Sequence, residues 1–157
     1  MFQQPKMLTK KYIKAHEKEL REAIVKEAYT CLKTPYHVLG QIKGVGFDCM
    51  TLLIEVYSKV GLIEWFKPPH YSPDFLLHRS EENYLEGVSK HGFKTDKYET
   101  GNIIVYKIGR VVSHSAIIVD YPTIIHSVMG KGCILDDASQ DFLKKHEHSI
   151  YSFWKDK

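Results

Sequence analysis

The sequence predicts an α+β domain in which helices come first and an antiparallel sheet follows. Residues 9–60 contain two segments whose apolar residues recur every three or four positions, which is the period of an amphipathic helix. Residues 102–135 instead hold short β-branched segments separated by Gly, Pro and Asp turn signals. At 157 residues the chain has the size of one domain. We therefore expect a single domain over residues 1–157, with residues 1–33 as an N-terminal helical segment.

The helical half divides at a proline and a group of glycines. Residues 9–32 form the first predicted helix, which ends before Pro35 because the residue preceding a proline disfavours the helical conformation. A loop over residues 40–46 follows. Asp48 is a good N-cap for a second helix over residues 49–60, and Gly61 is a good residue to end it. Residues 64–78 are expected to form an irregular covering loop, and a short helix is expected from Ser80 to about residue 91.

The second half is predicted to be mostly strand. The expected elements, in order, are strands at 102–107, 111–120, 123–128 and 132–135, a helix at 138–145 and a strand at 149–153. Turn signals lie between the first four strands. This pattern is typical of an antiparallel meander.

Composition excludes several classes of protein. The net charge of +3 is too small, and the basic residues too scattered, to favour nucleic acid. No window approaches the ~18 apolar residues of a membrane span, and the N-terminus lacks a signal-peptide pattern, so we expect synthesis in the cytoplasm. The three cysteines, Cys31, Cys49 and Cys133, show no CxxC spacing, which argues against a disulfide framework or a zinc site. His146 and His148 are interpreted as part of a solvated turn rather than as metal ligands.

Cys49 is either a nucleophile or a packing residue. A thiol at the first turn of a helix is favoured as thiolate by the helix dipole, and a nearby imidazole would complete its activation. His114 and His126 lie on consecutive predicted strands, so they can approach one another across an antiparallel pair. One would then act as the base and the other would orient it. The alternative is that Cys49 is a buried packing residue and both histidines are structural.

Four segments in this order carry a resemblance: TPYHVLGQIKGVGFDC, GNIIVYK, SHSAIIV and TIIHS. Together they resemble the NlpC-type cell-wall cysteine peptidases, a papain-like family, over residues 34–136. The Lys-Gly-Val-Gly loop before Asp-Cys, and the later Tyr-Ser-Pro segment, are similar to the branch found with phage tails and gene-transfer agents. The resemblance implies a papain-like fold, with N-terminal helices packed on an antiparallel sheet and the nucleophile at a helix N-terminus.

The resemblance also assigns roles to residues. It implies Cys49 as nucleophile, His114 as general base and His126 as the residue that orients it. Tyr36 matches the tyrosine whose hydroxyl helps to form the oxyanion pocket. Asp48 matches the Asp before the nucleophile, and we interpret it as a helix cap and a substrate contact. No cofactor or metal is implied.

Two positions depart from the family pattern. The family places a small pair such as Ser-Gly after Asp-Cys, whereas this chain has Met50 and Thr51. The family's Gly-Asp pair before the first strand is Gly101-Asn102 here. A larger residue at a helix packing point needs more room, so the substrate pocket is expected to differ.

The resulting hypothesis is a cysteine peptidase that hydrolyses peptidoglycan stem peptides, at the γ-D-glutamyl–diamino acid bond expected for the family. Its expected partners are stem peptides and phage-like tail proteins, and a phage-like particle would deliver it to the periplasm or cell wall. Two alternatives remain open. The same residues could serve a thiol acyltransferase, amidase or deamidase that acts on a protein or lipid. The chain could also be an inactive structural subunit of a tail.

Overall fold

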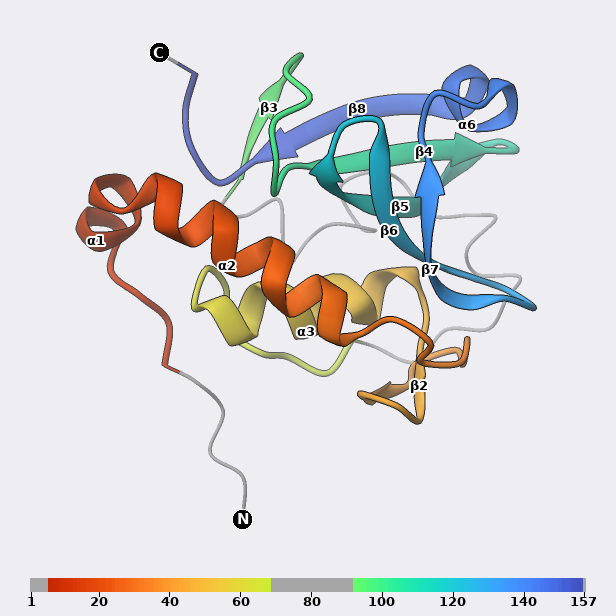
Figure 1. Cartoon of the computed structure of the whole chain (residues 1–157), viewed down its shortest axis with the longest axis horizontal. Helices are drawn as coiled ribbons and strands as arrows, with labels where there is room; N and C mark the ends of the chain where they lie inside the picture. Colours follow the sequence, from red (N-terminus) through yellow and green to blue (C-terminus); the bar gives the residue numbers. More distant parts are fainter. Residues whose placement is uncertain (1–5, 69–91, 157) are drawn as a thin grey trace.

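A computed structural model describes residues 6–68 and 92–156 of the chain (Figure 1). Helices α2 (Glu17–Thr30) and α3 (Cys49–Val60) lie side by side and pack against one face of a six-stranded sheet, while the short helix α6 (Asp141–His146) lies on the other. The α+β prediction is confirmed.

The six strands are β3 (Phe93–Thr95), β4 (Ile103–Ile108), β5 (Val111–Asp120), β6 (Thr123–Val128), β7 (Gly132–Asp137) and β8 (Glu147–Ser152). They pair in the order β3-β8-β4-β5-β6-β7, and every pairing is antiparallel. The predicted meander is β4 to β7. The last strand returns to the far side of β4, and β3 then pairs with it. β3 is not predicted by the sequence pattern; it is a three-residue strand whose partner lies at the opposite end of the described chain.

Predicted and observed strand limits differ most where a helix adjoins them. The strands predicted at 111–120 and 123–128 are observed with those limits. β7 extends to Asp137, two residues further than expected, and α6 accordingly begins at Asp141 instead of residue 138. β8 begins at Glu147, directly after α6.

The N-terminal segment forms two helices instead of the single one predicted. Helix α1 (Lys10–Ala15) is capped by Thr9, whose hydroxyl accepts a hydrogen bond from the N–H of Tyr12. The chain leaves helical geometry at His16, whose ring stacks on Tyr12 and whose Nδ1 bonds the Tyr12 carbonyl. α2 then buries Leu20, Ile24 and Ala28, which recur every four residues, as expected for an amphipathic helix.

Helix α3 has its predicted limits. Asp48 Oδ1 accepts hydrogen bonds from the N–H groups of Met50 (3.0 Å) and Thr51 (2.8 Å), and Thr51 Oγ1 accepts one from the N–H of Asp48 (2.8 Å). This is a reciprocal capping box. Gly61 ends the helix with φ +93°, a left-handed conformation that glycine adopts without strain. Residues 49–58 are all buried, so α3 is the central helix of the core.

The glycine loop before α3 is more ordered than expected. Residues Gln41–Ile42 (β1) and Gly46–Phe47 (β2) form a two-stranded ribbon. Gly46 packs so closely that a Cβ there would lie 2.5 Å from Cβ of His37. The ribbon therefore leads the chain directly into the capping box.

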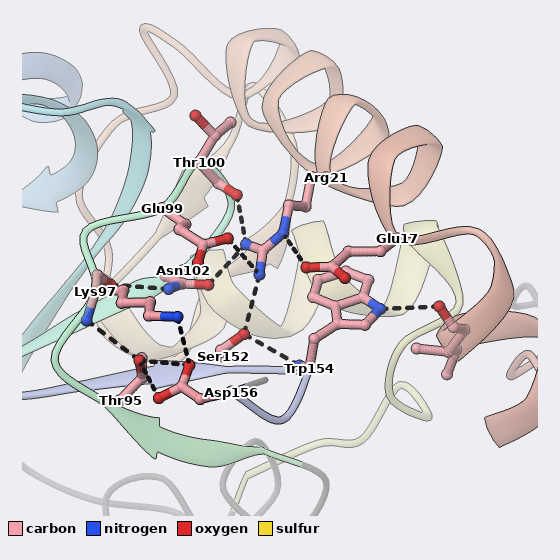
Figure 2. Close-up of polar contacts among 11 residues, drawn as sticks. Glu17, Arg21, Thr95, Lys97, Glu99, Thr100, Asn102, Ser152, Trp154 and Asp156 are labelled. Carbon is pink, nitrogen blue, oxygen red and sulfur yellow. Dashed lines mark hydrogen bonds and ion pairs between the residues drawn. The ribbon is translucent and has the colours of Figure 1, made fainter.

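A polar cluster centred on Arg21 ties α2 to the sheet (Figure 2). The Arg21 side chain is 12% exposed, and its Nε contacts Glu17 at 3.0 Å. Its Nη1 donates to the carbonyl of Thr100 (2.7 Å) and to Asn102 Oδ1 (2.8 Å), and its Nη2 contacts Ser152 and Glu99. The guanidinium also lies 4.6 Å from the centre of the Trp154 ring, a cation–π distance.

Two expected elements lie largely outside the described residues. Of the covering loop at 64–78, residues 64–68 are described and form no helix or strand. The helix expected from Ser80 falls entirely outside. Across residues 6–68 and 92–156, no helix combines the length and apolar character that crossing a membrane requires.

Candidate active site

Cys49 is the first residue of α3 and is 4% exposed. Its thiol lies against β5, with Sγ 3.7 Å from the carbonyl oxygen of Ser113. A β-bulge leaves Ser113 without an opposite residue in the register of β4 with β5, although its hydroxyl donates to the Ile108 carbonyl. Bulges commonly reorient neighbouring side chains at functional sites. The thiol therefore meets the sheet at the residue directly before His114. The position of Cys49 at the N-terminal end of a helix dipole also favours its thiolate form.

His114 and His126 form a direct hydrogen bond across β5 and β6. Nε2 of His114 lies 2.8 Å from Nδ1 of His126, and the two rings meet edge to face with centroids 5.0 Å apart. The ring of His114 lies beside the ring of Tyr106, with centroids 5.8 Å apart. His126 is 3% exposed. The expected approach of the two imidazoles across an antiparallel pair is confirmed.

Asp136 extends this series of hydrogen bonds, and it is not among the residues predicted from the sequence. Its Oδ2 lies 2.9 Å from Nε2 of His126. The hairpin of β6 and β7 pairs His126 with Ile134 and Ile124 with Asp136, so Asp136 is a diagonal neighbour of His126 on the same face. That register follows from the turn at residues 129–131. Counting residue pairs outward from this turn predicts that Asp136 lies diagonally opposite His126.

Two serines fix the sheet to the segment that carries the thiol. Ser115, the residue after His114, donates from Oγ to the carbonyl of Cys49 at 3.3 Å. Ser127, the residue after His126, donates from Oγ to the carbonyl of Phe47 at 2.8 Å. Both serines are completely buried. The strand positions that carry the imidazoles are thereby held in register with the start of α3.

Tyr36 lies beside the same segment. It forms a parallel bridge with Phe47, where the N–H of Phe47 bonds the carbonyl of Pro35 at 3.0 Å. Partial burial, followed by the negative charges that Cys49 and Asp48 can carry, raises the pKa of the Tyr36 hydroxyl. That hydroxyl therefore stays protonated and is available as a hydrogen-bond donor near the thiol.

Asp48 is 2% exposed and acts as the helix cap. Its Oδ1 bonds the first turn of α3, and its Oδ2 accepts from the N–H of Leu39 at 2.9 Å. The capping prediction is confirmed. A substrate contact by Asp48 stays a prediction.

Protonation states follow from burial and from these contacts. Burial, and then the neighbouring His126, lowers the pKa of His114 to about 3. Burial also lowers the pKa of His126, against the opposing effect of Asp136. Partial burial would raise the pKa of Asp136, but bonds from the Asp137 N–H, His126 and Gln140 together hold it below its usual value. At neutral pH the three hydrogen-bonded groups are therefore two neutral imidazoles, His114 and His126, and one carboxylate, Asp136.

The other cysteines behave as packing residues. Burial raises the pKa of both Cys31 and Cys133 to about 12, so neither thiol ionises at neutral pH. Within residues 6–68 and 92–156, no group of three or more His, Cys, Asp or Glu side chains is placed to hold a metal ion. The absence of a metal or cofactor stays a prediction.

Both departures from the family pattern have structural roles. Thr51 is completely buried and supplies one half of the capping box. Asn102 accepts from Arg21 through Oδ1 and donates through Nδ2 to the carbonyl of Lys97 at 3.0 Å. An aspartate could not make the second bond, because an ionised carboxylate has no hydrogen to donate.

Comparison with solved structures shows the fold. An NlpC/P60 family protein from Bacillus cereus aligns over 85% of this chain and 40% of its own, with 18% identity and a TM-score of 0.63. The NlpC/p60 domain of the peptidoglycan hydrolase SagA aligns over 84% of this chain and 97% of its own, with 21% identity and a TM-score of 0.59. The peptidoglycan hydrolase RipB from Mycobacterium tuberculosis aligns over 88% and 66%, with 17% identity and a TM-score of 0.55.

The chain thus spans less than half of the Bacillus cereus protein but almost all of the SagA domain. No curated protein matches the sequence. These likenesses establish a papain-like α+β fold. The model of the NlpC/P60 family matches residues 33–152, well over half of the sequence, and the chain therefore belongs to the NlpC/P60 family.

Proposed function

We propose that the chain is a cysteine peptidase that hydrolyses peptidoglycan stem peptides. The observation that carries this proposal is the position of the Cys49 thiol at the start of α3, against the residue that precedes the hydrogen-bonded pair His114–His126. Family membership supports it, as does the likeness of the fold to two peptidoglycan hydrolases, SagA and RipB.

The proposed reaction begins with proton transfer from Cys49 Sγ to His114. The thiolate attacks the carbonyl carbon of the scissile amide, and the oxygen of the tetrahedral intermediate accepts hydrogen bonds from the Cys49 N–H and the Tyr36 hydroxyl. Collapse of the intermediate breaks the C–N bond, and His114 returns its proton to the departing amine. The product of this half-reaction is a thioester on Cys49.

Deacylation uses the same groups in reverse. His114 removes a proton from water, and the hydroxide attacks the thioester carbonyl carbon. The C–S bond breaks, the acid product leaves and the thiol regains its proton from His114. His126 accepts a hydrogen bond from His114 throughout and so keeps the base in position.

The identity of the cleaved bond and the location of the enzyme are more specific proposals. The resemblance described above supports the bond between γ-D-glutamate and the diamino acid. The Lys43–Gly46 loop and the Tyr71–Pro73 segment support placement on a phage-like tail, which would deliver the enzyme to the periplasm or wall. Residues 71–73 lie outside the part of the chain that the structure describes. Mass spectrometry of purified particles tests the placement, and a protein found in lysates but missing from particles would contradict it.

Mass spectrometry of defined muropeptides tests the activity. Diaminopimelate-type and lysine-type peptides are incubated with the wild type and with Cys49→Ala. We expect cleavage by the wild type alone, and the fragment masses identify the bond. Products in which an amine or acyl group replaces water would show a transferase. Absence of any product on both peptide types would favour a structural subunit.

A further inference from the structure

We infer that Asp136 is a positioning residue of this site, whose carboxylate sets the protons of His126 and His114 so that Nδ1 of His114 is left bare to accept the proton of Cys49. The inference follows from three hydrogen-bonded groups in a row and from the rule that each bond needs one donor and one acceptor. It deepens the proposed function and names the atom that acts as base.

The carboxylate of Asp136 is itself held in place. Its Oδ1 accepts from the N–H of Asp137 at 2.9 Å and from Nε2 of Gln140 at 2.8 Å. These two donors fix the plane of the carboxylate, and they direct Oδ2 at Nε2 of His126, 2.9 Å away. Asp136 is therefore a rigid acceptor at one end of the chain.

The proton positions follow step by step from that end. An ionised carboxylate only accepts, so the hydrogen must be on Nε2 of His126. A neutral imidazole carries one ring hydrogen, so Nδ1 of His126 is an acceptor. It lies 2.8 Å from Nε2 of His114, which must then carry the hydrogen of that bond. Nδ1 of His114 is left with its lone pair. This nitrogen is the only basic atom of the neutral ring.

The surroundings keep both rings neutral, which the derivation requires. His126 is 3% exposed, and burial is the largest effect on the pKa of either histidine. If His126 were instead a cation, both of its nitrogens would donate. The proton of His114 would then lie on Nδ1, where it would block the base.

Asp136→Asn gives a prediction that a packing role does not. The two donors at Oδ1 select the amide oxygen of the new side chain, so its NH₂ group faces His126 and donates. His126 then carries its hydrogen on Nδ1, and His114 must accept through Nε2. The hydrogen of His114 moves to Nδ1, the atom that the proposed reaction uses as its base. Asp136→Ala removes the acceptor but imposes no reversed proton, so a fraction of molecules keeps the productive arrangement.

The expected order of turnover is therefore wild type, then Asp136→Ala, then Asp136→Asn. We expect a loss of at least about 100-fold in kcat for Asp136→Asn and a smaller loss for Asp136→Ala. A residue that only packs would give the reverse order, because Asn matches the shape of Asp and Ala does not. Asp120→Asn is the matched control. Asp120 is the exposed last residue of β5, and turnover should stay at the wild-type level.

Two-bond ¹H–¹⁵N spectra of histidine-labelled protein test the proton positions directly, without substrate. Signals are assigned with His114→Gln and His126→Gln. We expect hydrogens on Nε2 of both rings in the wild type, and on Nδ1 of both in Asp136→Asn. A wild-type hydrogen on Nδ1 of either ring, or unchanged positions in Asp136→Asn, would overturn the inference. If the spectra follow the prediction while muropeptides remain uncut, the proposed substrate fails and the inference stands.

Discussion

The Arg21 cluster and the histidine chain are both buried or half-buried polar networks, yet they are built differently. In the Arg21 cluster, Nε, Nη1 and Nη2 all have partners on three separate segments, and two carboxylates offset the charge. The histidine chain runs in one direction, from the Asp136 carboxylate through the neutral ring of His126 to the neutral ring of His114. The Arg21 cluster is complete by itself. The histidine chain leaves Nδ1 of His114 available as a base.

This difference indicates that the Arg21 cluster stabilises the fold and that the histidine chain serves catalysis. A guanidinium whose three nitrogens all have partners holds α2 against the sheet, and removing it would leave the buried Oδ1 of Asn102 and the carbonyl of Thr100 without this donor. Neutral rings contribute less to holding strands together, because the meander already pairs β5 with β6. Substitutions in the histidine chain should therefore change turnover, and substitutions at Arg21 should change stability.

His114→Gln should have the largest effect on turnover. Removing a general base typically costs about 10²- to 10⁴-fold in rate. The glutamine amide can still donate to Nδ1 of His126, so the chain to Asp136 survives and the fold should remain. Turnover on muropeptides and the thermal midpoint, measured on the same samples, check this. A large drop in the midpoint would show that the histidine chain is structural, like the Arg21 cluster.

Arg21→Met should have the next largest effect, on stability alone. Methionine keeps the aliphatic stem but leaves Oδ1 of Asn102 and the Thr100 carbonyl without their donor, whereas Ser152 Oγ still accepts from the backbone N–H of Trp154. We expect a loss of about 2–4 kcal/mol in the free energy of unfolding. Turnover per folded molecule should stay the same. Urea unfolding and an activity titration measure the two quantities, and Arg21→Lys is the control that keeps the charge. Unchanged stability would contradict the comparison.

Thr51→Val should have the smallest effect. It conserves the shape of the side chain but removes the oxygen that accepts from the N–H of Asp48, which should cost about 1 kcal/mol. Because the Thr51 side chain serves the capping box, we expect KM to stay unchanged. A raised KM with unaltered urea unfolding would instead place Thr51 in the substrate pocket.

The sequence predicted the local features of the fold well. The limits of α3 follow from Asp48 and Gly61, and the limits of β5 and β6 follow from their flanking turns, because each depends on residues close in the chain. The pairing of β3 with β8 depends on contacts between distant segments, which no local pattern encodes. The break at His16 was missed for another reason: its own ring bonds the helix backbone, and the spacing of apolar residues does not record that.

The site was predicted in part. Cys49, His114, His126 and Tyr36 were selected because their residue types suit the chemistry and match a family pattern. Their roles remain proposals. Asp136 was missed because a lone acidic residue near a strand end has no distinctive pattern, and only the register of β6 with β7 places it beside His126.

The most direct test of the central claim is the rate at which iodoacetamide alkylates each cysteine of the native protein, read by peptide mass spectrometry. The account predicts that Cys49 reacts first, that Cys31 and Cys133 react only on unfolding, and that His114→Gln slows the reaction of Cys49 at least about tenfold. A Cys49 that reacts no faster than the other two, or at the same rate in His114→Gln, would show a packing cysteine and contradict the account.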